Sequence, residues 1–209
     1  MKKLAIIAIL LLGISPLLRA QEEEDWSFPV KYSGQKPVIT DFVNAVFSLE
    51  DIGESLGGMR GDWKLYQAGK ALPEGHSFTV DVKNGYMRYD SSYTEDDGTV
   101  YNHFIEFCFW NCSDGRHKLV AENTVSFRDG KPFMGQFSGI SFYMYDGNTK
   151  RMVFTSGYDL GLDFDYPDNM EVLVQQLPRY GKTIEHRFYT TTGEVLIKTT
   201  WNGSRFVVE

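Results

Sequence analysis

Pairs of Asp or Asn with Gly recur along most of this chain and separate runs of aromatic and β-branched residues. The pairs begin at Asn84, Asp97, Asp114, Asp129, Asp146 and Asn202, and Gly193 marks one further turn. Asx and Gly tolerate the positive φ angles that tight hairpin turns require. Strands joined by such turns form an antiparallel meander, whereas parallel strands need long crossover connections. The runs between the turns cover 78–82, 86–89, 99–111, 117–127, 133–145, 150–156, 170–177, 183–190, 194–201 and 205–208.

Two of these runs are apolar at both even and odd positions. The run 104–110 contains a single charged residue, Glu106, and the run 140–145 has aromatic residues at both parities. Strands of this kind are covered on both faces. We therefore predict a mainly β fold in which an antiparallel meander forms a sandwich, with a small barrel as the alternative.

One helix is predicted near the N-terminus, from Asp41 to about Leu56. Phe42 and Val46 recur at helical spacing, and the glycine pair at 57–58 is expected to end the helix. Its apolar side is expected to cover one face of the sheet.

The first 20 residues are predicted to be a secretory signal peptide. Two lysines precede an apolar run, and Ala20 precedes the expected cleavage site. The apolar run is too short for a transmembrane helix. An acidic leader, 21–25, then precedes a single β-rich domain, 26–209. The sequence thus predicts an exported protein without a transmembrane segment.

The charge of the mature chain excludes some partners. Of the 21 Lys and Arg residues three lie in the signal peptide, so 28 Asp and Glu residues leave a net charge of −10 with His neutral. Binding to nucleic acid or to anionic lipid depends on clustered basic residues. No nucleic-acid partner is therefore expected.

Cys108 and Cys112 are the two cysteines of the chain. On a straight strand their Cα atoms would lie roughly 13 Å apart, whereas a disulfide needs less than about 7 Å. Either both thiols are free, or the chain turns at Trp110 or Asn111 and a local disulfide forms. The spacing does not match the CxxC motif of thiol oxidoreductases.

The acidic segment 159–169 is the candidate metal site. Oxygen ligands on a bent loop suit Ca²⁺, although the spacing is not that of an EF-hand. The alternative is a solvent-exposed acidic loop, and no other cofactor is expected. The candidate ligands are Asp159, Asp163, Asp165 and Asp168.

Aromatic residues make up 15% of the chain. Tyrosines on one sheet face can bind sugars, peptides or apolar ligands, and the alternative is cross-strand packing. The candidate ligand-binding residues are Tyr86, Tyr89, Tyr93 and Tyr101.

No catalytic residues are predicted. His76, His103, His117 and His186 are scattered, and no two share a metal-ligand spacing. Ser138 lacks the spacing of a nucleophile elbow, and no phosphate-binding glycine motif is present.

Two C-terminal segments, LPRYGKTIE at 177–185 and TTWNGSRF at 199–206, resemble the C-terminal portions of uncharacterised small exported proteins of Gram-negative bacteria. The resemblance implies a β fold and export to the periplasm or outer surface. It assigns no activity and no functional residue.

The expected function is that of an exported, non-catalytic module that binds a protein or glycan ligand. One alternative is a hydrolase that acts on glycan or peptide through Asp and Glu. Two close carboxylates of raised pKa in a pocket would indicate that hydrolase, and an aromatic face would indicate the binding module. A second alternative, a structural or inhibitor protein of the envelope, would show a large apolar patch.

Overall fold

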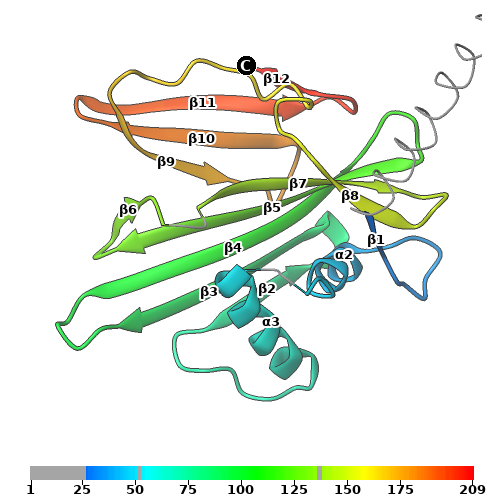
Figure 1. Cartoon of the computed structure of the whole chain (residues 1–209), viewed down its shortest axis with the longest axis horizontal. Helices are drawn as coiled ribbons and strands as arrows, with labels where there is room; N and C mark the ends of the chain where they lie inside the picture. Colours follow the sequence, from blue (N-terminus) through cyan, green and yellow to red (C-terminus); the bar gives the residue numbers. More distant parts are fainter. Residues whose placement is uncertain (1–26, 51–52, 136–137) are drawn as a thin grey trace, which may run out of the picture.

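The computed structural model describes residues 27–50, 53–135 and 138–209 (Figure 1). The predicted signal peptide and acidic leader lie outside the described residues. None of the helices within these ranges is long and apolar enough to span a membrane.

The larger sheet contains eight strands among the described residues, all paired antiparallel. Their order is β1-β8-β7-β5-β4-β3-β2, with the short strand β6 beside β5. Pro29 lies in β1, at the end of this order, as expected for a residue that has no backbone N–H to donate. The strands are β1 (Ser27–Pro29), β2 (Ser77–Asp81), β3 (Tyr86–Thr94), β4 (Val100–Asn111), β5 (His117–Arg128), β6 (Lys131–Phe133), β7 (Gly139–Asp146) and β8 (Arg151–Thr155).

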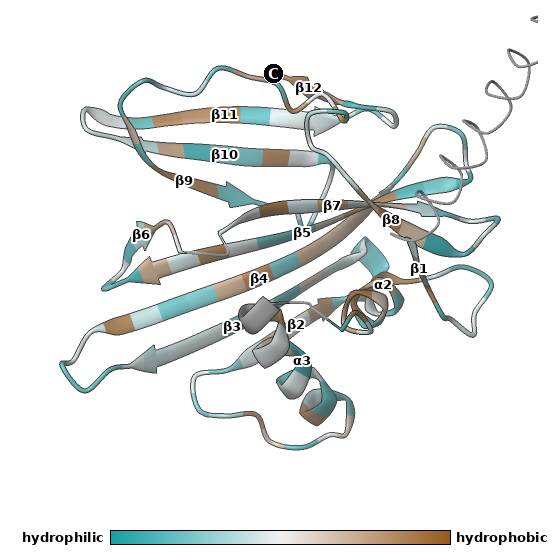
Figure 2. Ribbon diagram, viewed as in Figure 1, coloured by the Kyte–Doolittle hydropathy of each residue, from teal (hydrophilic) through white to brown (hydrophobic). Residues whose placement is uncertain are grey.

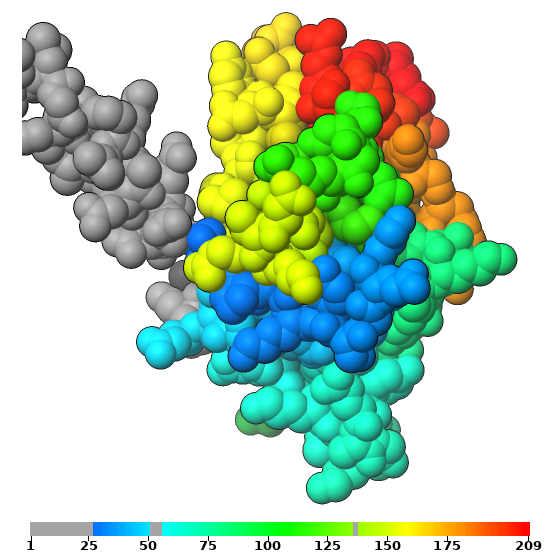
Figure 3. All heavy atoms as spheres, turned by 90° about the vertical axis from the view of Figure 1, so that its right-hand side faces the viewer, coloured from blue at the N-terminus to red at the C-terminus, as the bar shows by residue number. Residues whose placement is uncertain are grey.

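The smaller sheet packs on one face of the larger one. It has the order β12-β11-β10-β9. Both sheets are open at their ends, which confirms the predicted antiparallel sandwich rather than the small barrel. Figure 3 shows the layers end on, with the C-terminal sheet above the central strands and the N-terminal segments below. The strands are β9 (Met170–Gln176), β10 (Thr183–Thr190), β11 (Gly193–Trp201) and β12 (Phe206–Val208).

Two helices, α2 (Ile39–Val46) and α3 (Gly53–Gln67), cover the opposite face of the larger sheet (Figure 1). The prediction of one helix over 41–56 was therefore wrong in its bounds. α3 continues through the glycine pair at 57–58, because Leu56, Met59 and Trp63 form a buried stripe along it. Burial of that stripe outweighs the low helix propensity of Gly.

Alternate residues of the larger sheet enter two different cores, and Figure 2 shows the alternating bands of hydropathy along its strands. Met87 and Phe107 point to the helices, whereas their neighbours Tyr86 and Cys108 point to the smaller sheet. We call these faces the helix side and the sheet side. The sheet-side core consists of Tyr86, Cys108, Trp110, Leu119, Ala121, Phe142, Leu160, Leu177, Ile184, Trp201 and Phe206.

The turn at Asn84-Gly85 differs from the predicted two-residue hairpin. Asp81 pairs with Tyr86, so four residues connect β2 and β3, and 82–84 form a 3₁₀ turn that ends at Gly85 with φ 66°. The paired positive φ angles expected there occur instead at Asp129-Gly130, with values of 50° and 74°, between β5 and β6.

Both cysteines are free thiols. β4 runs without a turn to Asn111, so Cys108 stays in the sheet-side core and Cys112 lies just beyond the strand. Of the two alternatives, the free thiols are therefore correct.

Candidate ligand-binding face

The four predicted tyrosines divide between the two sides of the larger sheet. Tyr86 lies on the sheet side, where its hydroxyl donates to Glu106 Oε1 at 2.7 Å. Tyr89 lies on the helix side and is also buried. Tyr93 and Tyr101 come together beyond the helices. The structure thus brings two of the four into one partly exposed group.

Tyr93 and Tyr101 are direct cross-strand partners on β3 and β4. Their ring centroids lie 5.1 Å apart at an interplanar angle of 10°. His103, two residues further along β4, stacks on Tyr93 at 5.8 Å, and Phe133 of β6 meets Tyr101 edge-on at 5.9 Å. We call these four residues the tyrosine stack. Because the Tyr93 residue remains 48% exposed, its ring is available to a ligand.

The tyrosine stack is uncharged at neutral pH. Burial lowers the pKa of His103, whose Nδ1 lies 2.8 Å from Ser126 Oγ. Burial and the negative charge of Glu95 raise the pKa of Tyr93. The stack therefore offers ring faces and hydrogen-bonding groups rather than a charge.

A group of polar side chains adjoins the stack on the helix side. Asp62 Oδ2 lies 2.6 Å from His76 Nδ1 and accepts a hydrogen bond of 2.6 Å from the Tyr89 hydroxyl. We call Asp62, His76 and Tyr89 the polar cluster. Burial and the charge of Asp62 raise the pKa of Tyr89, which keeps the phenol protonated.

Two atoms of the polar cluster have no hydrogen-bond partner among the described residues. They are Asp62 Oδ1 and His76 Nε2, since both bonds of Asp62 end on Oδ2 and those of His76 on Nδ1. The side chains of Asp62 and His76 are 12% and 23% exposed, so each reaches solvent. His76 thus presents Nε2 as a second polar atom beside the Asp62 carboxylate.

Further aromatic rings continue from the polar cluster onto α3. Phe78 lies 4.8 Å from the Tyr89 ring. Tyr66 stacks on Trp63 at 5.3 Å and is 42% exposed. Trp63 is held in place by its Nε1–H, which donates to Asn44 Oδ1 at 2.8 Å. These three rings form an aromatic group at the edge of the cluster.

These groups together form the candidate site, which we call the binding face. Tyr89, Ser91 and Tyr93 share the helix side of β3, and four residues along a strand span roughly 13 Å. The β3–β4 hairpin extends past α3, so the tyrosine stack lies outside the helical cover (Figure 1). The binding face consists of Asp62, Trp63, Tyr66, His76, Phe78, Tyr89, Ser91, Tyr93, Tyr101, His103 and Phe133.

Two buried carboxyl groups of raised pKa lie on opposite sides of the larger sheet. Glu106 is opposite Asn123 and points to the sheet side, while Glu122 is opposite Phe107 and points to the helix side. Burial raises the pKa of both, that of Glu122 to about 7. The sheet separates them, so they do not form a catalytic pair.

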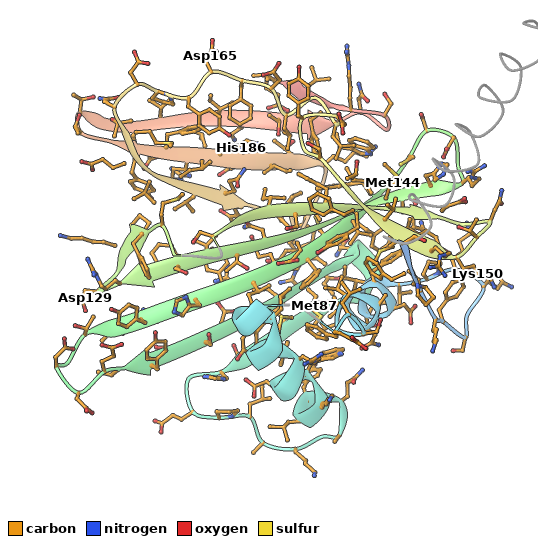
Figure 4. All side chains as sticks on the ribbon, viewed as in Figure 1. Met87, Asp129, Met144, Lys150, Asp165 and His186 are labelled. Atoms are coloured by element: carbon orange, nitrogen blue, oxygen red, sulfur yellow. The ribbon has the colours of Figure 1, made fainter. Side chains whose placement is uncertain are left out.

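The acidic segment 159–169 does not gather its carboxylates. All four aspartates are exposed, and no three His, Cys, Asp or Glu side chains in the described part of the chain could hold a metal ion. Phe164 turns inward and packs on His186 at 4.9 Å, whereas Asp165 points outward (Figure 4). The segment is therefore fixed by its aromatic residues, and the described residues offer no Ca²⁺ site there.

Sequence reasoning missed Asp62 and His76. Because the predicted helix ended near Leu56, Asp62 lay outside every predicted helix and strand. The sequence around His76 showed no residue that could pair with its ring. Asp62 follows Met59 by three residues, so a helix continued to Gln67 would have placed this carboxylate beside the buried stripe.

Comparison of the chain with protein-family models, with curated proteins and with solved structures finds no match. The chemistry of the binding face is therefore the basis for assigning a function.

Proposed function

We propose that this chain is a non-catalytic module that binds a ligand on the binding face, with a ring of the ligand stacked on Tyr93. The half-exposed, uncharged stack of Tyr93 on Tyr101 carries the proposal. An exposed aromatic ring already ordered by a neighbouring ring loses little conformational freedom when a ligand covers it.

The position of the ionisable groups favours binding over hydrolysis. A glycoside hydrolase needs two carboxyl groups that reach into one site and flank the scissile bond, roughly 5 to 10 Å apart. Glu106 and Glu122 are separated by the sheet, and Asp62 is the one carboxylate of the binding face among the described residues. Among the described residues, the side-chain hydrogen bonds of Asp62 and His76 reach only each other and Tyr89, and so no Ser or Cys nucleophile.

Export belongs to the same proposal. A cleaved signal peptide over residues 1–20 and the C-terminal resemblance support a place in the periplasm or on the outer surface of a Gram-negative bacterium. The strongly acidic mature chain argues for a partner that is neither nucleic acid nor anionic lipid.

The test is ligand capture by the chain purified after export. It is presented to a glycan array and to a Gram-negative envelope extract, beside Tyr93→Ala. We expect that variant to bind at least roughly tenfold more weakly, equivalent to about 1.4 kcal/mol, because it removes the exposed stacking ring. Tyr158→Ala is the matched control, since Tyr158 is 69% exposed and lies between β8 and β9. Equal binding by Tyr93→Ala and Tyr158→Ala would exclude the binding face as the place where the ligand binds.

A further inference from the structure

We infer that the ligand is a chain of neutral sugars that lies along β3, with one sugar ring on the tyrosine stack and another at the polar cluster. This inference rests on the proposed function and adds the chemical class and the length of the ligand.

The first support is the chemistry of the two ends. The tyrosine stack offers a ring face without charge, which suits the apolar face of a sugar ring. The polar cluster offers Asp62 Oδ1, which accepts hydrogen bonds, and His76 Nε2, a second polar atom that can bond to a hydroxyl group, which both donates and accepts. A ligand must therefore combine an apolar face with hydroxyl donors, as neutral sugars do. Anionic ligands would be repelled by the Asp62 carboxylate.

The second support is distance. Tyr89 and Tyr93 are separated by four residues of extended strand, or roughly 13 Å. A single sugar ring is too short to reach both the stack and the polar cluster, so the occupant is an oligomer. The exposed ring of Tyr66 lies beyond the cluster and extends the same face.

A peptide fits this arrangement less well. Extended peptides gain affinity by pairing their backbone with the free edge of a sheet. The binding face presents side chains on the surface of β3 and β4, which pair with each other, and β5 pairs with the other edge of β4. β2 covers the outer edge of β3 up to Asp90, so only the last four residues of β3 offer a free backbone edge. A peptide lying across it would leave most of its backbone groups without partners.

The experiment is calorimetric titration of the exported chain with disaccharides and hexasaccharides of the cello-, malto-, xylo- and chito-oligosaccharide series. At least one hexasaccharide is expected to bind about tenfold or more tightly than its disaccharide. Tyr93→Ala should weaken both lengths. His76→Gln should weaken the hexasaccharide about tenfold and leave the disaccharide on the stack unchanged.

The chain supplies a matched control in a second His–Asp pair. His117 Nδ1 contacts Asp114 Oδ2 near the β4–β5 turn, away from the binding face. His117→Gln should leave both affinities unchanged, and thermal melts of all variants should confirm that they fold.

The outcomes separate the two proposals. If no sugar series binds, or if chain length has no effect on affinity, the carbohydrate inference is overturned. Tyr93-dependent capture of peptides from a tryptic digest of casein would overturn it as well, while the proposed function would stand. Sugar binding that Tyr93→Ala leaves unchanged would overturn both.

Discussion

Glu122 is a buried carboxyl group that receives one side-chain hydrogen bond among the described residues, from the Tyr143 hydroxyl at 3.1 Å. Burial raises its pKa from 4.5 to about 7. Between these pH values the folded chain holds a proton that the unfolded chain has released. The contribution of Glu122 to stability is therefore complete below about pH 4.5 and is lost as the pH rises through 7.

Glu122→Gln should remove this pH dependence, because the amide has no proton to lose. The unfolding free energy of the variant minus that of the parent should increase by on the order of 2 to 3 kcal/mol when the pH is raised from about 4 to about 8. Urea unfolding at both pH values measures the difference. Glu171→Gln, on the exposed side of β9, is the control and should show no such change. Parallel pH profiles for Glu122→Gln and the parent would contradict the assignment.

At the scale of secondary-structure elements, α3 is a helix that forms although it contains glycines, which have a low helix propensity. Gly57 and Gly58 lie inside the helix, and a Cβ added to either meets no atom within 4 Å. Gly85, in contrast, has a φ of 66°, and a Cβ there would lie 2.7 Å from the Phe109 ring. Alanine is therefore compatible with the first two positions and incompatible with the third.

Gly57→Ala and Gly58→Ala should each stabilise the chain by about 0.5 to 1 kcal/mol, since Ala favours the helix and restricts the unfolded chain. Gly85→Ala should destabilise the chain, because the added Cβ would clash with the Phe109 ring. Thermal melts of the three variants provide the comparison. If the two helix variants melted below the parent, the glycines would end a helix after all, as the local sequence indicates.

At the scale of the whole molecule, Glu106 joins the two sheets. Its Oε2 accepts from the Leu177 N–H at 3.0 Å and from Asn123 Nδ2 at 3.1 Å. The same Asn123 amide donates to the Gln175 carbonyl at 2.7 Å, so β5, β4 and the end of β9 share one network. Arg88, 3.9 Å away, supplies the nearest positive charge.

Glu106→Leu should cost about 3 kcal/mol or more, because three buried donors lose their acceptor. Glu106→Gln should cost less, since the Tyr86 hydroxyl can turn to accept from the new amide. The unfolding free energies of the two variants, measured by chemical denaturation, show which substitution costs more. Glu194→Gln, which breaks an exposed pair with Arg187, should cost under about 1 kcal/mol. Equal losses for the buried and exposed variants would show that the network does not hold the sheets together.

Much of the architecture could be predicted from the sequence because it depends on neighbouring residues. Asx-Gly pairs set the turns, and period-two patterns set strands whose bounds agree closely with the structure, as in β10 and β12. The run 140–145, apolar at both parities, correctly indicated a strand covered on two faces. One predicted run, 133–145, divides into β6 and β7, because Phe133 pairs with Ser126 before the chain continues to β7.

The binding face depended on the tertiary structure instead. Of the four tyrosines proposed as ligand-binding residues, Tyr93 and Tyr101 lie together as cross-strand partners, whereas the alternation of side chains along β3 places Tyr86 on the opposite side of the sheet. Asp62 and His76 are 14 positions apart and meet on Tyr89 only because α3 passes through its glycines and packs on β2 and β3. Local patterns thus determined which segments are strands, since turns and alternation act between neighbours. Long-range packing decided which side chains meet, since that depends on burial summed over the whole sheet.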